Sequence, residues 1–148
     1  MAGIPSIAML GYGSVFEIVD DNSPDLFVPM AEVKSITPPS IKVDQVEVTH
    51  MQSPDRYREF ISGLMDGGEA SFEMNFVPGN ASDLRLFQLL NLPVGVSRRR
   101  ACRISFPNGR TWSFNAEVTG YDPTVPFDSV MTAKVTMKVT GGISAGIT

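Results

Sequence analysis

The chain has 148 residues, 43% of them hydrophobic, and a formal net charge of −4 at pH 7. These values suit one domain, residues 1–148, with its own core, and they exclude a disordered chain and a protein that binds nucleic acid through an overall basic surface. The single cysteine, Cys102, excludes an internal disulfide framework and a cysteine-rich metal site.

Residues 1–12 are small, apolar and glycine-containing, which predicts an N-terminal arm rather than a packed element. No basic leader region accompanies this run, and Pro5 and Gly11 interrupt it, so we interpret it as neither a secretory signal nor a membrane span. The apolar positions of a later β-rich segment change phase between Val43 and Val46, which indicates a bulge or bend. The elements predicted in this first third are strands at 14–20, 30–36 and 41–49 and a turn at 20–24.

Residues 50–68 mix charged side chains, single apolar residues and glycines without a sustained period. This pattern predicts a long loop with one short helical turn near residues 55–60. Long loops within compact domains are usually functional or disordered, so this segment is a candidate for contacts with other molecules.

Residues 69–77 alternate between apolar and polar side chains, which is typical of a strand with one face on a core. A helix is predicted next, with Asn80 as its N-cap and Asp83 in its first turn. Its apolar residues cover a wide arc, which indicates packing against a sheet, and Pro93 is expected to end it.

Residues 100–106 and 110–120 are predicted to form a hairpin around Pro107-Asn108-Gly109. A two-residue Asn-Gly loop would point the apolar faces of the two strands in opposite directions. A three-residue loop instead places the apolar residues on one face, and proline and glycine suit its first and last positions. The expected facing pairs are Phe106 with Arg110, Ile104 with Trp112, and Cys102 with Phe114.

Residues 130–140 show the cleanest alternation in the chain, and the small residues at 141–148 are predicted to form a C-terminal arm. The chain is therefore predicted to be mainly β, an antiparallel β barrel or sandwich with one flanking α-helix. The side chains expected in its core include Phe72, Phe87, Trp112 and Val135.

The sequence offers no reaction centre. His50 is the only histidine, so no zinc site or catalytic triad can be completed. Glu69 and Glu73 are four residues apart on a predicted strand, about 13 Å, which is too far for paired acid–base work. The basic run at residues 98–100 is interpreted as a solvated strand edge rather than a nucleic-acid contact. We therefore expect no enzyme activity, no metal and no cofactor.

The order of segments carries a family resemblance. A strand runs into "ITPP", a long loop follows, and then come "GGEASFEMNFVPGNASDLRLFQLLN", "ACRISFPNGRTWSFNAEVTGY" and "SVMTAKVTMKVTG". This order, over residues 28–142, resembles the tail tube protein (major tail protein) of lambda-like long-tailed bacteriophages.

The resemblance implies a barrel-like β fold flanked by a helix, in subunits that form rings, typically of six, stacked into a tube. DNA would pass through the tube from capsid to host. The implied partners are further copies of the chain, a tape measure protein, and terminator and baseplate proteins, with transient passage of double-stranded DNA and no membrane. The implied location is the virion tail, assembled in the host bacterial cytoplasm.

Two alternatives remain open. A related ring protein, either a tail terminator or a secretion-system tube, would share the fold, and a terminator would stop at one ring. A monomeric β-barrel binding module with a small-molecule pocket would stay monomeric at all concentrations.

Two groups of residues are expected to act in such a tube. The polar faces of the strands would line the channel, where mixed charge without a dense basic stripe would let DNA slide. The expected lumen-lining residues are Glu69, Glu73, Asn75, Asn115, Glu117, Lys134 and Lys138. The loop at 50–68 is expected to order against a neighbouring subunit or ring. Its expected contact residues are Asp55, Arg56, Tyr57, Arg58, Phe60 and Asp66.

Overall fold

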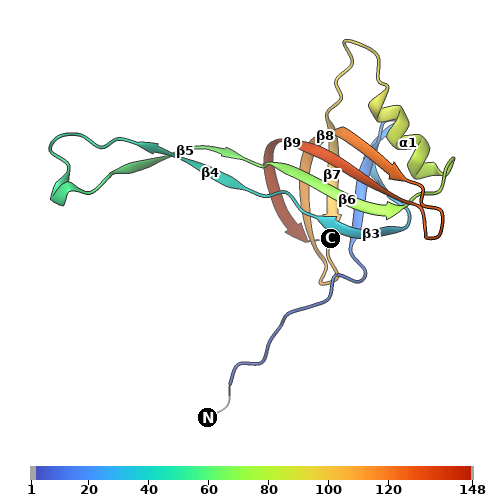
Figure 1. The fold of residues 1–148 in the computed structure, drawn as a ribbon, viewed down its shortest axis with the longest axis horizontal. Coiled ribbons are helices and arrows are strands. Elements are labelled where there is room, and N and C mark those ends of the chain that lie inside the picture. Colours follow the sequence, from blue (N-terminus) through green and yellow to red (C-terminus); the bar gives the residue numbers. More distant parts are fainter. Residues whose placement is uncertain (1–2, 148) are drawn as a thin grey trace.

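The structure, a computed structural model, describes residues 3–147. Its main feature is an antiparallel seven-stranded sheet with the strand order β2-β1-β7-β8-β9-β6-β3, and a separate two-stranded hairpin, β4-β5, projects from it (Figure 1). The strands are β1 Val15–Asp20, β2 Ser23–Pro29, β3 Val33–Thr37, β4 Lys42–Glu47, β5 Phe60–Asp66, β6 Glu69–Asn75, β7 Arg100–Ser105, β8 Arg110–Thr124 and β9 Thr132–Ile147. The helices are a 3₁₀ turn, η1, at Pro54–Arg56 and the α-helix α1 at Ala81–Leu90.

The predicted fold class is confirmed, because the described chain is mostly antiparallel β with one α-helix. The sheet curves around its core but does not close into a barrel, since β2 and β3 form its two edges and do not pair with each other (Figure 1). The helix α1 covers one end of the sheet beside β8. Within the described residues, no helix has the length and apolar character that a membrane crossing requires.

The core lies on the face of the sheet where alternate strand residues are apolar. Phe16 from β1 stacks on Phe72 from β6 with ring centroids 4.5 Å apart, and it meets Phe114 from β8 edge-on at 6.3 Å. Val135 from β9 is fully buried beside them. The predictions for Phe72 and Val135 are thus confirmed, and β6 and β9 are both interior strands, each paired along both of its edges.

Two of the predicted core residues are more exposed than expected. Trp112 is half-buried and packs edge-on against Phe106 at 5.9 Å. Phe87 is 51% exposed, because the buried side of α1 carries Leu86 and Leu89 instead. The Phe87 ring contacts the ring of Tyr121 edge-on. The prediction that Phe87 belongs to the core is therefore wrong, and the apolar arc of the helix is wider than the surface it covers.

The β7–β8 hairpin has the predicted three-residue turn. Ile104 faces Trp112, Cys102 faces Phe114, and the Phe106 amide donates to the Arg110 carbonyl at 2.8 Å. Gly109 has φ of +85°, the left-handed conformation that such a loop needs at its last position. Cys102 is fully buried, and burial raises the pKa of its thiol to about 12, so it acts as a small core hydrophobe.

Three segments differ from their predictions. Ser23 and Pro24, the last two residues of the predicted turn at 20–24, instead begin β2, and only Asp21 and Asn22 connect it to β1. Residues 60–66 of the predicted loop form β5. Residues 141–147 of the predicted C-terminal arm are the second half of β9, and residue 148 lies outside the described residues. That half of β9 pairs with the start of β8. The backbone hydrogen bonds formed there offset the weak strand propensity of glycine and serine.

A buried carboxylate joins α1 to the sheet. The Asn80 side chain accepts a hydrogen bond from the Asp83 amide at 2.8 Å, as predicted for the N-cap. The Asp83 carboxylate in turn accepts from the Gly79 amide at 2.9 Å and from the Tyr121 hydroxyl on β8 at 2.7 Å. Burial, and then the nearby Asp83 carboxylate, raise the pKa of Tyr121 well above its usual range, so the hydroxyl stays protonated and donates.

Asp83→Ala is expected to lower the free energy of unfolding by about 2–3 kcal/mol, because it leaves the Gly79 amide and the Tyr121 hydroxyl without their acceptor. Urea unfolding of the purified subunit measures this loss. Asp128→Ala, at an exposed turn position, is the control and should change stability by no more than about 0.5 kcal/mol. Equal stability of the two variants would contradict the assigned role.

Candidate functional site

Among residues 3–147, no group of three His, Cys, Asp or Glu side chains could hold a metal ion. His50 instead holds a loop, since its Nδ1 accepts from the Gln52 amide at 3.1 Å and its Nε2 lies 3.6 Å from a Glu59 oxygen. The candidate functional parts of the subunit are three exposed surfaces: the projecting hairpin, the polar face of the sheet and the N-terminal segment.

The β4–β5 hairpin projects far from the sheet, and every residue of both strands is exposed (Figure 1). Its register pairs Lys42 with Asp66 and Glu47 with Phe60, and it shifts between Val43 and Gln45, at the predicted change of phase. An isolated two-stranded ribbon is marginally stable in water. By itself, the hairpin buries no residue of either strand.

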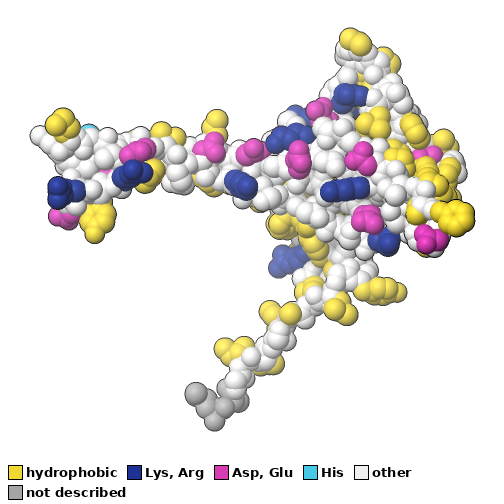
Figure 2. Space-filling model, in the orientation of Figure 1, with side chains coloured by type: hydrophobic (Ala, Val, Ile, Leu, Met, Phe, Trp, Pro, Cys, Tyr) yellow, Lys and Arg dark blue, Asp and Glu magenta, His cyan; other side chains and the backbone are white. Residues whose placement is uncertain are grey.

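The hairpin carries large apolar side chains that are exposed in the single subunit. Figure 2 shows them spaced along the whole projection, interleaved with acidic and basic residues. Isolated exposed apolar residues are ordinary, but a run along one projecting element marks a contact surface. The exposed apolar residues of this surface are Ile41, Val43, Val46, Val48, Met51, Tyr57, Phe60, Ile61, Leu64 and Met65.

The hairpin tip, residues 48–59, is an ordered loop. The Ser53 hydroxyl donates to a Glu59 carboxylate oxygen at 2.7 Å, and the Glu59 amide donates to the Thr49 hydroxyl at 2.9 Å. Of the predicted contact residues, Asp55, Arg56, Tyr57 and Arg58 lie in this tip. Phe60 and Asp66 instead lie at the two ends of β5. The predicted short helical turn corresponds to η1.

The seven predicted lumen residues lie together on the polar face of the sheet, opposite the core. Strand register places Lys138 of β9 between Glu69 of β6 and Glu117 of β8, and Lys134 between Glu73 and Asp122. Asn75 and Asn115 occupy the same face at the ends of this array. Because acidic residues flank each lysine, the face has mixed charge and no continuous basic stripe.

A second polar cluster extends this face across β1 and β7. The Arg103 guanidinium donates to a Glu17 oxygen at 2.7 Å and lies over the Phe27 ring, 4.4 Å from its centroid. The Ser105 hydroxyl donates to the other Glu17 oxygen at 2.9 Å. The alternation of residues 103 and 105 in the hairpin strand is visible in the sequence, but their partner lies more than eighty positions away, so sequence reasoning missed the cluster.

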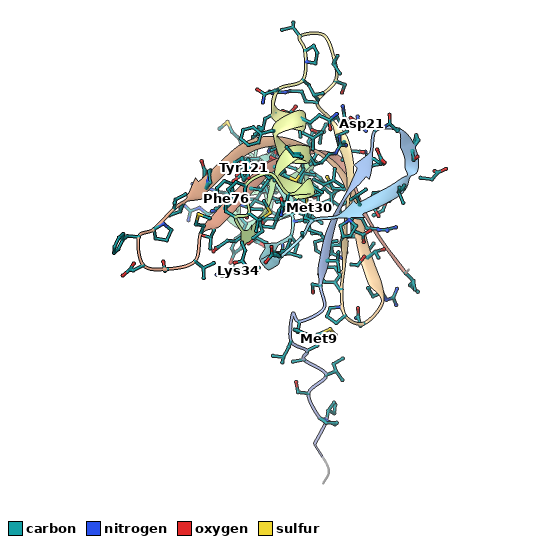
Figure 3. The ribbon with its side chains drawn as sticks, turned by 90° about the vertical axis from the view of Figure 1, so that its right-hand side faces the viewer. Met9, Asp21, Met30, Lys34, Phe76 and Tyr121 are labelled. Carbon is teal, nitrogen blue, oxygen red and sulfur yellow. The ribbon has the colours of Figure 1, made fainter. Side chains whose placement is uncertain are left out.

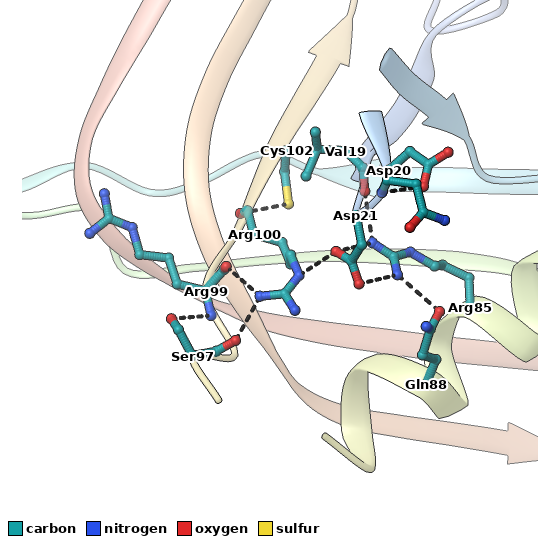
Figure 4. Close-up of polar contacts among 10 residues, drawn as sticks. Val19, Asp20, Asp21, Arg85, Gln88, Ser97, Arg99, Arg100 and Cys102 are labelled. Atoms are coloured by element: carbon teal, nitrogen blue, oxygen red, sulfur yellow. Dashed lines mark hydrogen bonds and ion pairs between the residues drawn. The ribbon is translucent and has the colours of Figure 1, made fainter. Parts of the chain in front are cut away.

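Two arginines of the basic run at residues 98–100 contact other parts of the same subunit. Asp21 lies between Arg85 of α1 and Arg100 of β7, with contacts of 3.0 and 2.8 Å (Figure 4). The hydrogen bond from Arg85, followed by that from Arg100, lowers the pKa of Asp21 to about 2. Arg98 donates to the Leu90 carbonyl at the end of α1. The interpretation of this run as a solvated edge is thus wrong for Arg100, whose side chain is only 15% exposed.

Residues 3–10 have no regular secondary structure and are exposed, while residues 1–2 of the predicted arm lie outside the described residues. Met9 lies on this segment at the lower end of the sheet, whereas Met30, Phe76 and Tyr121 lie near the helix (Figure 3). Where the segment reaches the sheet, a groove of about 650 Å³ opens. The groove is lined in part by Leu10, Tyr12, Val33, Ile36 and Phe106.

Comparison with known proteins gives a match over nearly the whole chain. A family model described as "Lambda phage tail tube protein, TTP" matches residues 12–146. No curated protein matches the chain.

Solved structures with low sequence identity share the fold. A chain from the tail of an empty GTA particle, computed with helical refinement and C6 symmetry, superposes with a TM-score of 0.76 at 18% identity, over 95% of this chain and 99% of that chain. A chain from the sheath-tube complex of the extracellular contractile injection system PVC gives 0.73 at 14% identity, over 96% and 93%. A chain from the tube-terminating cap of the anti-feeding prophage gives 0.74 at 12% identity, over 100% and 97%.

Proposed function

Because the chain belongs to the lambda phage tail tube protein family, we propose that its subunits close into rings of six and that the rings stack into a hollow tail tube through which DNA passes. The family is one of structural tail proteins and not of enzymes. The observation in this chain that carries the proposal is the β4–β5 hairpin, which has no buried residue and a run of exposed apolar side chains. Contact with further copies would cover that surface.

Ring closure and stacking would also use the two open edges of the sheet. β2 and β3 each pair on one side only, and unpaired strand edges associate readily unless they are covered. β2 contains Pro24 and Pro29, which have no backbone N–H, so this strand offers fewer hydrogen-bond donors to a neighbouring strand. A closed ring of identical subunits would cover both edges by one repeated contact.

The similarity to the tail of the GTA particle, whose description gives C6 symmetry, supports six subunits in each ring. The proposed location is the tail of the virion, after assembly in the cytoplasm of the host bacterium. The proposed partners beyond the chain itself are a tape measure protein within the tube and terminator and baseplate proteins at its ends.

Electron microscopy of the purified protein tests the assembly. At high protein concentration we expect hollow tubes with a regular axial repeat. The fold is also similar to the tube-terminating cap of the anti-feeding prophage, so a terminator is the second candidate. Single rings that never stack would favour the terminator, and a monomer at every concentration would refute both.

We further propose that the mixed-charge face of β6, β8 and β9 lines the channel. DNA carries a negative charge about every 1.7 Å of its axis, and each neutralised phosphate adds affinity. A conduit has to avoid that accumulation. On this face Lys134 and Lys138 each lie between two acidic residues, so no basic stripe could hold the duplex.

Converting Glu69, Glu73 and Glu117 together to lysine is expected to leave tubes intact, because these positions lie on the polar face and not in the core. Phage carrying this triple variant should eject DNA more slowly, and added salt should restore part of the rate, because the new phosphate contacts are salt-dependent. Time-resolved ejection at two salt concentrations measures the effect. Failure to form tubes would place these residues at an interface, and normal ejection at low salt would refute the lumen assignment.

A further inference from the structure

The direction of the β4–β5 hairpin depends on its root, where the hairpin joins the sheet. No residue of either hairpin strand is buried, so no core of its own fixes how the hairpin projects. A recess of about 260 Å³ lies beside the root, lined in part by Ile41, Met65 and Ile143. Because side chains do not fill this recess, side-chain packing at the root does not by itself fix the angle between the hairpin and the sheet.

Two glycines bring the backbones of the root into close contact. Gly68 has φ of +67°, and a Cβ there would lie 2.8 Å from the Ser40 carbonyl oxygen on the other side of the root. A Cβ on Gly67 would lie 2.7 Å from Cγ1 of Val139 on β9. The Gly68 carbonyl also accepts from the Val139 amide at 3.0 Å, which continues the β6–β9 ladder up to the root.

A polar contact links the last residue of β5 to the sheet. One carboxylate oxygen of Asp66 accepts from the Gly68 amide at 2.8 Å and lies 3.4 Å from the Lys138 amine on β9. The Gly68 hydrogen bond, followed by Lys138, lowers the pKa of Asp66, so its carboxylate is ionised at neutral pH. An exposed ion pair of this kind adds little to overall stability. Asp66 contacts Gly68 and Lys138 at the same time, so its carboxylate links the end of β5 to β9.

We propose that Asp66, Gly67, Gly68 and Lys138 form a rigid joint that sets the direction of the hairpin. This role of Lys138 is separate from its proposed place in the channel: in the joint, its amine on β9 contacts Asp66 at the end of β5. The joint is a property of the single subunit, and its consequence for assembly rests on the proposed function. A hairpin held in its bound direction before contact loses less conformational freedom on association with a second copy.

The joint is tested in the monomer by the distance between two spin labels. Ile61→Cys places one label on β5, and Leu84→Cys places the other on α1; both positions are more than half exposed. Native Cys102 is fully buried and remains unlabelled. Pulsed electron resonance on dilute protein then reports how widely the hairpin direction varies.

The doubly labelled protein with the native root is expected to give one narrow distance distribution. Asp66→Asn removes the charge at nearly constant shape, and Gly68→Ala adds the Cβ that meets Ser40; each should broaden or shift the distribution. The exchanged pair Asp66→Lys with Lys138→Asp should narrow it in part, because it restores the ion pair but not the acceptor for the Gly68 amide. Asp44→Asn is the matched control, the same change on an exposed carboxylate of β4, and should have no effect.

Tube formation by the same root variants without labels provides the second readout. We expect Asp66→Asn to raise the protein concentration needed for tubes by about two- to fivefold, and the exchanged pair to restore it in part. Unchanged distances in both single variants would refute the proposed joint. If Gly68→Ala does not fold, the distances in Asp66→Asn alone provide this test. Altered distances with normal tubes would overturn the link between hairpin direction and assembly. If the native protein forms no tubes, the proposed function fails while the distance measurement still decides the joint.

Discussion

Replacing residues 50–58 by Asn-Gly is expected to abolish tube formation and to leave the free energy of unfolding of the subunit within about 0.5 kcal/mol of its native value. The change removes the exposed tip and joins Thr49 to Glu59, which already contact each other through the Glu59 amide and the Thr49 hydroxyl. Asn-Gly suits a two-residue turn between antiparallel strands. Stability is spared because no removed residue belongs to the core.

Two measurements check this prediction. Urea unfolding follows the stability of the subunit, and electron microscopy with sedimentation follows tubes. A variant of native length, with glycine and serine at Met51, Tyr57 and Arg58, distinguishes side-chain contacts from hairpin length. Trypsin should cleave the free subunit after Arg56 or Arg58, which lie in the exposed tip, and should spare assembled tubes. Normal tubes from the shortened protein, or equal cleavage of both forms, would contradict the role of the tip.

Phe72→Ala is expected to lower the free energy of unfolding by about 3–5 kcal/mol, a large share of the roughly 5–15 kcal/mol that stabilises an ordinary domain. Phe72 is 2% exposed and stacks on Phe16 at 4.5 Å, at the point where β6 meets the core. Its removal leaves a cavity between β1 and β6, which are far apart in the strand order and meet there only because the sheet curves.

Phe87→Ala is the matched comparison, with the same truncation on a side chain that is 51% exposed. It should lower stability by about 1 kcal/mol, since mainly its edge-on contact with Tyr121 is lost. Urea unfolding of both variants gives the two values directly. A larger loss for Phe87→Ala than for Phe72→Ala would show that the helix, and not the aromatic stack, forms the centre of the core.

The β4–β5 hairpin connects the stability of the subunit with its assembly. The sheet and helix fold around a core that contains no hairpin residue. The subunit can therefore present a projecting surface without using it for its own stability. In the proposed tube, association with further copies supplies the burial that the hairpin lacks, because apolar side chains that are exposed in the monomer leave water on contact.

Local sequence was sufficient for several parts of the structure. Alternation in β6 and β9 predicted which residues face the core, because successive side chains of a strand point to opposite faces. Asn80 and Asp83 marked the start of α1 through capping chemistry that acts within four residues. The turn at Pro107-Asn108-Gly109 set the register of β7 against β8, and the order of these segments was enough to suggest the tail tube family.

Contacts between distant segments were decided only by the tertiary structure. Residues 60–66 have no clear alternation, and they become β5 because the backbone of residues 42–47 pairs with them. Phe87 looks like a core residue in the helix pattern, but the sheet covers only the side of α1 that carries Leu86 and Leu89. The root contact between Asp66 and Lys138 spans 72 positions. Periodicity reports which face of an element is apolar; which other element covers that face depends on strand order and sheet curvature, and these arise from the whole chain.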